Sequence, residues 1–426
     1  QKEKPLVSII ILNYNAGKLL LDCVNSVFSS NYKNFEVIVV DNVSTDNSHK
    51  KCKETFEKIV LIENKRNLGY CKGNNVGIEN ANGEYIIILN PDTIVEPNWI
   101  QKFLDAHEKY GDGLFQGKNV AMSDEKILRS TGNMIQLFGF GSARDKGKID
   151  SGQRKNVEQV NYASGTCLFT SKSTMLKIGL FDPFLFLYHD DLDLGWRAAC
   201  LNIKSFFVPD VKIKHVSSYA LQWSAKKFFW LERNRKYCLL THYSSSTRRK
   251  MFFSLLVVDL MVSLFYLGKG MMKAKISADL DIFKHRKTIK KRYAELEKLK
   301  IVNDKKIIEQ FSDNVFIPED ISNEISYVKE KYSKINDDLN LDYFESSTFS
   351  DQLSLYISWA SDNFITIYKT VCVDFSGSKP KVSFLTNFDW KKLKSEYELE
   401  DSLNRYLYLK VRREILNQVI EQSLPW

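Results

Sequence analysis

Residues 7–48 read VSIIILNYNAGKLLLDCVNSVFSSNYKNFEVIVVDNVSTDNS, and this stretch decides the fold class. Two apolar, largely β-branched runs, Val7 to Leu12 and Phe35 to Val40, enclose a stretch with helical spacing at 17–30. Such runs are typical of strands buried on both faces of a parallel sheet, with the helix as crossover. Polar residues follow both strands at once: Asn13-Tyr14-Asn15 and Asp41-Asn42. We therefore expect a doubly wound, mostly parallel α/β sheet with a ligand site at the carboxyl ends of its strands.

The alternation of strands and helices continues along the chain. We expect helices at 44–57 and 73–81, and strands at 59–62, 85–89 and 203–208, the last leading to 211–215. Residues 110–160 are richer in glycine and polar residues, so we expect loops around a site there. From Ser224 onward the pattern becomes helical.

Composition narrows the function classes. The chain has 426 residues, 44% of them hydrophobic, which suits two or three domains with packed cores. Its seven cysteines include no CxxC pair, which is typical of a reduced, intracellular protein without a zinc ribbon. The first residues run straight into a strand and carry no secretory signal, and no apolar run reaches 18 residues.

The positive charge is concentrated in one segment. Residues 236–300 hold 15 Lys or Arg and 5 Asp or Glu, within a chain whose net charge is +9. Inside this segment, residues 251–267 are apolar apart from two serines and Asp259, and lysines and arginines flank them. This pattern favours helices lying on an anionic membrane surface, on the inner face of the cell membrane. A buried helix that docks the C-terminal part is the competing interpretation.

Three domains follow from these patterns: 1–235 catalytic, 236–300 basic and apolar, and 301–426 C-terminal. The last should be α+β or mainly helical, with strands at 364–374 and 381–388 and a closing helix at 399–421. We expect it to recognise an acceptor or to support a homodimer.

Two clusters of residues carry candidate chemistry. Asp92 follows the strand at 85–89, and the glycine- and asparagine-rich turn at 67–77 leads into a helix that could present N–H groups to an anion. Further on, residues 189–197 read HDDLDLGWR, where neighbouring carboxylates repel one another and at least one pKa should rise. His215 follows a β-run and could bind a metal as neutral imidazole.

The order of these pieces is more specific than any one of them. VSIIILNYN, VIVVDNVSTDNS, NLGYCKGNNVGI, IIILNPDT, ASGTCLFTSKSTMLKIGLFD, FLYHDDLDLGWR and VKIKHVSS together resemble the family 2 inverting glycosyltransferases of GT-A fold. The resemblance is to the rhamnosyltransferase-like and galactofuranosyltransferase-like branch, and it covers about residues 5–235.

The resemblance implies a role for each matched residue. A nucleoside diphosphate sugar, UDP- or dTDP-linked, would be held by Asn13, Asn15, Asp41, Asn42, Asn67, Gly69, Asn90 and Asp92. Asp92 and His215 would bind Mg²⁺ or Mn²⁺, and Asp191, with Asp190 beside it, would supply the base. The acceptor would be a glycan or a lipid-linked glycan. The chain departs from the family at Asn90, where relatives have Asp, and at Asp190, where many have Glu.

Other function classes fit less well. A nucleic-acid-binding protein would carry basic residues on a face interleaved with aromatics, whereas here they flank an apolar run. A sugar-nucleotide nucleotidyltransferase would need a basic, glycine-rich loop after the first strand, and residues 13–18 match this poorly. A non-catalytic glycan-binding relative would not need Asp92, Asp191 and His215 together.

Overall fold

The structure is a computed structural model that describes residues 4–216, 224–311, 371–374 and 381–384. The chain separates into two compact units. The first contains residues up to 135, 139–244 and 277–311, and the second contains 136–138, 245–276 and the residues from 312 onward. The expected closing helix at 399–421 and its dimer face lie outside the described residues, as does most of the expected 301–426 domain.

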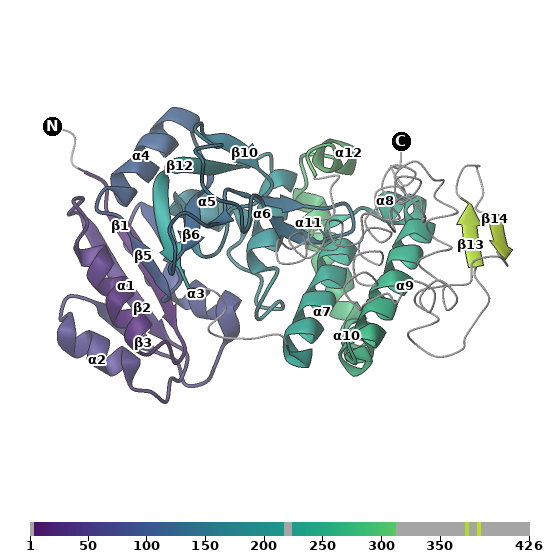
Figure 1. Cartoon of the computed structure of the whole chain (residues 1–426), viewed down its shortest axis with the longest axis horizontal. Coiled ribbons are helices and arrows are strands. Elements are labelled where there is room, and N and C mark those ends of the chain that lie inside the picture. Colours follow the sequence, from purple (N-terminus) through teal and green to yellow (C-terminus); the bar gives the residue numbers. More distant parts are fainter. Residues whose placement is uncertain (1–3, 217–223, 312–370, 375–380, 385–426) are drawn as a thin grey trace, which may run out of the picture. The chain divides into compact units, whose positions relative to one another are not determined.

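The first unit is built on a ten-stranded sheet (Figure 1). Its order is β10-β12-β6-β11-β4-β1-β2-β3, with β5 paired to β12 and β7 to β6. Parallel pairs join β1 to β2 and β4, β2 to β3, and β12 to β6, while β11 and β10 are antiparallel to their neighbours. The expected α/β fold with a mostly parallel sheet is confirmed.

The strands of the first unit, including the small pair β8–β9, have these bounds: β1 Val7–Asn13, β2 Phe35–Asp41, β3 Val60–Glu63, β4 Tyr85–Leu89, β5 Thr93–Val95, β6 Gly113–Ala121, β7 Leu128–Ser130, β8 Asn133–Ile135, β9 Gly141–Ala143, β10 Glu158–Val160, β11 Cys167–Ser171 and β12 Lys204–His215. The helices along the chain are α1 Lys18–Phe28, α2 Ser48–Thr55, α3 Gly69–Glu79, α4 Trp99–Tyr110, α5 Lys172–Ile178, α6 Asp190–Cys200, α7 Ala225–His242, α8 Ser245–Lys250, α9 Phe252–Gly268, α10 Met272–Lys284, α11 Arg286–Leu299 and α12 Asp304–Ile308.

Helices cover both faces of the sheet because β1 alternates its side chains between them. Ile9 and Ile11 belong to the core cluster that also includes the apolar faces of α1 and α4. Ile10 points to the other face, where α3 packs so closely that a Cβ on Gly77 would lie 2.3 Å from it. The uninterrupted apolar run therefore reflects burial on both sides, as expected.

One expectation was wrong. Residues 110–160 do not form loops alone: they contain β6, a nine-residue strand buried along nearly its whole length. Its sequence, GLFQGKNVA, has little alternation and few β-branched residues, so local pattern does not reveal it. The strand forms because β11 and β12 pair with its two edges, which is a long-range effect.

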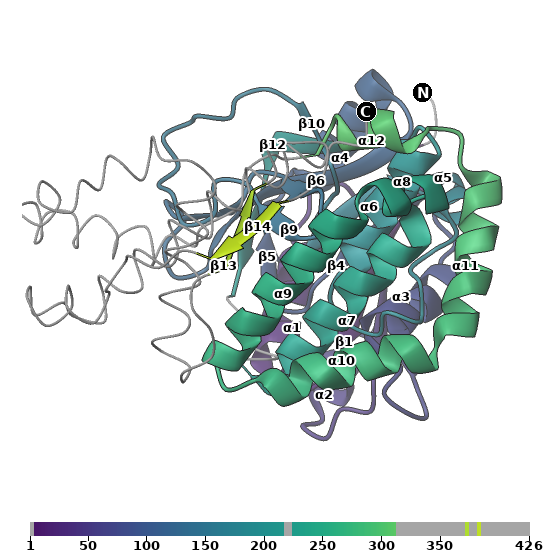
Figure 2. The same cartoon turned by 90° about the vertical axis from the view of Figure 1, so that its right-hand side faces the viewer.

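The helices that follow the sheet return to it. α7 and α11 pack side by side in the first unit (Figure 2). Arg292 of α11 contacts Asp182, with its Nε 2.9 Å from Oδ2, and Tyr237 of α7 donates a hydrogen bond to the same carboxylate. These contacts join residues 277–311 to the unit that carries the candidate site.

The second unit contains α8, α9 and the first residues of α10. Asp259, which interrupts the apolar run, pairs with Lys275, Oδ1 to Nζ 2.9 Å. No helix in the described part of the chain is both long and apolar enough to cross a membrane. Within the expected 364–374 and 381–388 strands, β13 Val371–Asp374 and β14 Lys381–Phe384 form an antiparallel pair.

Candidate active site

The carboxyl ends of the parallel strands converge on one cavity of about 440 Å³. Its floor and walls come from the ends of β1, β2, β4 and β12 and from the starts of α3, α6 and α7. The cavity brings together eight of the eleven residues expected from the sequence. These are Asn42, Asn67, Gly69, Asn90, Asp92, Asp190, Asp191 and His215.

Asp92 and His215 meet because β5 pairs with the end of β12. The register places His215 opposite Thr93, and the Val216 N–H donates to the Asp92 carbonyl. His215 Nε2 then lies 3.2 Å from Asp92 Oδ2. Asp92 is 3% exposed, and its Oδ1 has no hydrogen-bond partner among the described residues.

The Asp92–His215 geometry fits a divalent cation. Neighbouring ligand atoms around an octahedral ion, each at roughly 2.1 Å, lie roughly 3 Å apart. A buried carboxylate oxygen without a donor is the group that such an ion would satisfy. Asn90 lines the same cavity but offers a neutral amide, so the carboxylate at this position of the family pattern is missing.

The second feature is the buried carboxylate pair at the start of α6. Asp191 Oδ2 accepts a hydrogen bond from the Gly165 N–H at 3.0 Å, and Oδ1 accepts from the Leu192 N–H at 2.9 Å. Burial raises the pKa of Asp191, while these N–H groups oppose the rise. Burial and the neighbouring Asp191 charge raise the pKa of Asp190 well above its ordinary value. Asp190 also accepts a backbone hydrogen bond, from the Asp191 N–H at 3.0 Å, so N–H groups hold both carboxylates of the pair.

Gly165 allows this arrangement. Its carbonyl accepts a hydrogen bond from the Tyr70 hydroxyl at 2.7 Å, while its N–H holds Asp191. A Cβ at this position would lie 2.7 Å from the Tyr70 hydroxyl oxygen. A side chain at position 165 would therefore push the Tyr70 hydroxyl away from the Gly165 backbone, whose N–H holds Asp191.

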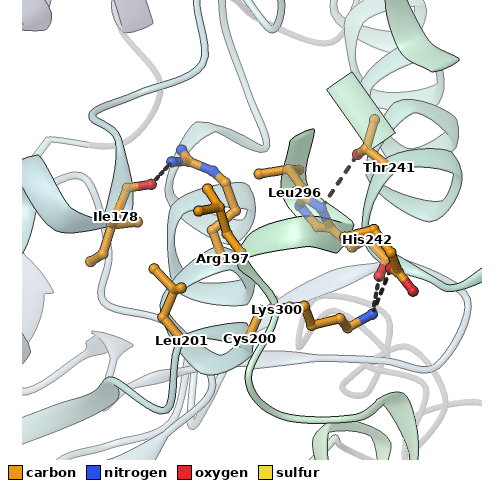
Figure 3. Close-up of a pocket in the computed structure, with 10 residues that line it drawn as sticks. Ile178, Arg197, Cys200, Leu201, Thr241, His242, Leu296 and Lys300 are labelled. Atoms are coloured by element: carbon orange, nitrogen blue, oxygen red, sulfur yellow. Dashed lines mark hydrogen bonds and ion pairs between the residues drawn. The ribbon is translucent and has the colours of Figure 1, made fainter. Parts of the chain in front are cut away.

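A network of charged and polar side chains supports α6. Asp193 is fully buried and pairs with Arg197, Oδ2 to Nη2 2.7 Å, and with His242, Oδ1 to Nε2 2.9 Å. Arg197 holds the pKa of Asp193 well below its ordinary value, against the effect of burial. Figure 3 shows Arg197 reaching the Ile178 carbonyl, at 2.8 Å. Both carboxylate oxygens of Asp193 thus have a side-chain partner, the Arg197 guanidinium and the imidazole of His242, whose pKa burial lowers, and these contacts join α6 to α7.

The small cavity beside this network has a volume of about 20 Å³, which suits one water molecule and no sugar. Lys300 closes it by donating to the His242 carbonyl at 2.7 Å (Figure 3).

At the opposite end of the large cavity, Asn42 organises the turn before α3. Its Nδ2 donates to the Gly69 carbonyl at 3.0 Å, and its Oδ1 accepts from Asn64 at 2.9 Å. The Asn67 side chain accepts from the Gly69 N–H. Gly69 has φ +75°, and a Cβ there would lie 2.5 Å from Phe186, so only glycine fits. The next N–H, of Tyr70, donates to the Phe186 carbonyl at 2.6 Å. The sequence suggested that N–H groups here would face an anion, but this one bonds to the protein itself.

The other three expected residues, Asn13, Asn15 and Asp41, do not line the cavity. Asn13 is fully buried, and its Nδ2 reaches Asp41 at 2.8 Å and Ser48 at 2.9 Å. Asp41 also accepts from the Ser44 N–H, and Asn15 accepts from the Thr45 N–H. Their polar atoms thus fix the loop after β2, and a direct contact with a nucleotide stays a prediction.

The cavity also contains residues for which the sequence indicated no role of their own. They include the turn Ser164-Gly165-Thr166, the segment Phe186-Leu187-Tyr188-His189, and Lys226 and Lys227 of α7. Gly165 had a signal, because a glycine before a buried strand often permits close approach. The lysines had none, because lysines at the start of a helix are usually solvated.

Comparison with known proteins agrees with this geometry. Residues 8–176 match the model of "Glycosyl transferase family 2". Over 113 residues the chain is 37% identical to "Glycosyltransferase GlyG" of Streptococcus pneumoniae, covering 25% of this chain and 37% of that protein. Over 241 residues it is 22% identical to "N-acetylglucosaminyl-diphospho-decaprenol L-rhamnosyltransferase" of Mycobacterium tuberculosis, covering 50% of this chain and 77% of that protein.

Among solved structures, GalNAc-T7 with UDP, GalNAc and Mn²⁺ aligns with a TM-score of 0.48 at 15% identity, over 59% of this chain and 51% of that one. The chain spans little more than a third of the length of GlyG. Residues 8–176 are therefore similar to glycosyl transferase family 2, and the mixed sheet with its candidate site at the carboxyl edge agrees with the GT-A fold.

Proposed function

We propose that the protein is an inverting glycosyltransferase. It moves a sugar from a UDP- or dTDP-linked donor to a hydroxyl of a lipid-linked or nascent surface glycan. The family match and the glycosyltransferase relatives support the reaction class. The rhamnosyltransferase relative and the residues around Asp191 favour the rhamnosyltransferase-like branch of the family.

One observation carries the mechanism: Asp191 and the Asp92–His215 pair line the same cavity. Transfer from a nucleoside diphosphate sugar needs neutralisation of the leaving diphosphate and removal of the acceptor proton. When bound, Mg²⁺ or Mn²⁺ at Asp92 and His215 would neutralise the diphosphate. Asp191 would take the proton from the acceptor hydroxyl, a contribution of roughly 10²–10⁴ in rate. With Asp191 as the base, one direct displacement of the diphosphate by the acceptor hydroxyl would invert the anomeric carbon.

The residues of the chain divide the work. Asn42, Asn67 and Gly69 shape the end of the cavity that would take the nucleotide, above the loop fixed by Asn13 and Asp41. The Gly165 N–H keeps the Asp191 carboxylate in place and favours its charged form. The pKa of Asp190 is raised more strongly than that of Asp191, so Asp190 would lose its proton only at a higher pH. In its protonated form it would not compete for the proton of the acceptor.

Incubation of the full chain with radiolabelled UDP- and dTDP-sugars and Mn²⁺ tests this proposal. A lipid extract from a bacterial cell envelope serves as acceptor. We expect transfer of label to the extract with one sugar nucleotide, and nuclear magnetic resonance should find the inverted anomer. Absence of transfer and of donor hydrolysis across the panel, or a product with retained configuration, would overturn it.

We further propose that the protein acts at the inner face of the cell membrane. In α9, Phe252, Leu256 and Leu260 recur at helical spacing, and each is 57–59% exposed. Arg248, Arg249 and Lys250 precede this apolar face. Apolar side chains beside cations suit the boundary between acyl chains and anionic headgroups.

Flotation with vesicles tests the membrane proposal. The protein should float with vesicles containing phosphatidylglycerol and stay behind with pure phosphatidylcholine, and added salt should release it. Replacement of Phe252 and Leu256 by Ser should reduce flotation, whereas Leu176→Ser, at an exposed leucine of α5, should not. Equal behaviour with both vesicle types would contradict the proposal.

A further inference from the structure

One wall of the cavity carries two lysines to which the proposed reaction gives no role. Lys226 and Lys227 come from the first turn of α7 and line the same cavity as Asp191. The Lys227 ammonium lies over the Tyr188 ring, 5.6 Å from its centroid, and Tyr188 stands two residues before Asp190. The lysines therefore line the cavity together with the segment that leads into the carboxylate pair.

Asp92, Asp190 and Asp191 line the same cavity, but none of these three carboxylates forms an ion pair with either lysine. Neither Lys226 nor Lys227 forms an ion pair with a described residue, and residues 217–223, SSYALQW, contain no acid. Burial and the positive charge of Lys146 lower the pKa of Lys227. Like charges gathered at a cavity wall are stabilised when an anion binds between them.

The wall is also held rigidly. Phe186, Tyr188 and His189 have left-handed φ angles of +63°, +67° and +60°, which non-glycine residues rarely adopt. Asn234 of α7 is fully buried, and its amide nitrogen reaches the carbonyls of residues 185, 187 and 188 at 2.8–3.0 Å. Strained backbone held by dedicated hydrogen bonds is typical of functional sites. α7 thus supplies the lysines and also fixes the segment that faces them.

We propose that this wall is the acceptor subsite and that Lys226 and Lys227 bind a phosphate group of the acceptor, close to its reacting hydroxyl. Two ammonium groups match the charge of about −2 that a phosphate monoester carries near neutral pH. A neutral glycan would leave both lysines without an ion-pair partner among the described residues. The proposal rests on the proposed function, because it assigns the acceptor of that reaction.

Binding to the UDP-saturated protein in Mn²⁺ tests the proposal without turnover. Geranyl phosphate and geraniol are the matched probes, since they differ only in the phosphate. The wild-type protein should bind geranyl phosphate at least tenfold more tightly than geraniol. The double variant Lys226→Ala, Lys227→Ala should lose that difference, because hydrogen bonds to charged groups contribute about 1.5–3 kcal/mol each. Its affinity for UDP should not change.

The matched control is Lys50→Ala with Lys51→Ala, two adjacent exposed lysines of α2, which should bind both probes as the wild type does. The proposal is overturned if the wild type binds the two probes equally. It is also overturned if the Lys226, Lys227 variant prefers geranyl phosphate as strongly as the wild type does. Loss of UDP affinity in the Lys226, Lys227 variant also overturns it, because the lysines would then hold the donor diphosphate. If UDP itself does not bind the wild type, the proposed function fails instead.

Discussion

Asp92 Oδ2 and His215 Nε2 lie 3.2 Å apart, although β6 to β11 stand between the two residues in the sequence. The pairing of β5 with β12 brings them together, and the other oxygen of Asp92 has no donor among the described residues. The pair therefore has the spacing of two ligands of one cation.

Asp92→Ala should weaken the thermal stabilisation of the protein by UDP with Mn²⁺ and should lower transfer in parallel. His215→Ala should act in the same direction but less severely, because water can fill the position of a lost neutral ligand. Differential scanning fluorimetry and the transfer assay measure both effects. Asp22→Ala, at an exposed carboxylate of α1, is the control and should behave as wild type. Full Mn²⁺-dependent stabilisation in Asp92→Ala would remove the metal assignment.

The pH dependence of transfer should report the carboxylate pair. Burial raises the pKa of Asp191, so its basic form disappears at a higher pH than for an ordinary aspartate. Activity should therefore fall as pH decreases, with the midpoint of kcat/KM above the ordinary carboxyl range. Asp191→Asn should remove this acid limb from the residual activity, whereas Asp22→Asn should keep it. An acid limb that persists unchanged in Asp191→Asn would point to another base.

Asn234→Ala should destabilise the first unit. The substitution removes the donor that reaches three carbonyls and leaves the left-handed segment 185–189 unsupported. Unsatisfied buried polar groups cost about 1–3 kcal/mol each, so the unfolding midpoint should fall by several degrees. Asn80→Ala removes an amide that donates only to the Val76 carbonyl at the exposed end of α3, and should have little effect. Equal unfolding midpoints for Asn234→Ala and Asn80→Ala would contradict the supporting role of Asn234.

The parts of the site that could be predicted from the sequence are those with a local sequence pattern. The strands before Asn13, Asp41 and Asn90 are continuous apolar runs, so their carboxyl ends, and the polar residues there, could be predicted. Which of those residues face the cavity could not be predicted. Asn13 and Asp41 bond to each other and to the folded loop after β2, whereas Asn42 bonds to Gly69 and Asn64.

The unexpected parts depend on contacts between distant segments. β6 is a strand because β11 and β12 cover its edges, not because GLFQGKNVA has a strand pattern. Phe186, Tyr188 and His189 are bulky residues in left-handed backbone, which sequence associates with glycine or asparagine. Asn234, far along the chain, holds them there. Such a clamp has no local signature.

The central claim is that donor binding and proton removal belong to separate groups in one cavity, and the Asp191→Asn variant tests it most directly. A single experiment measures its stabilisation by UDP with Mn²⁺ and its transfer of labelled sugar, beside wild type and Asp190→Asn. The account predicts that Asp191→Asn keeps the stabilisation and loses transfer by about two or more orders of magnitude, while Asp190→Asn is milder. Normal transfer by Asp191→Asn, or loss of UDP binding together with transfer, would contradict it.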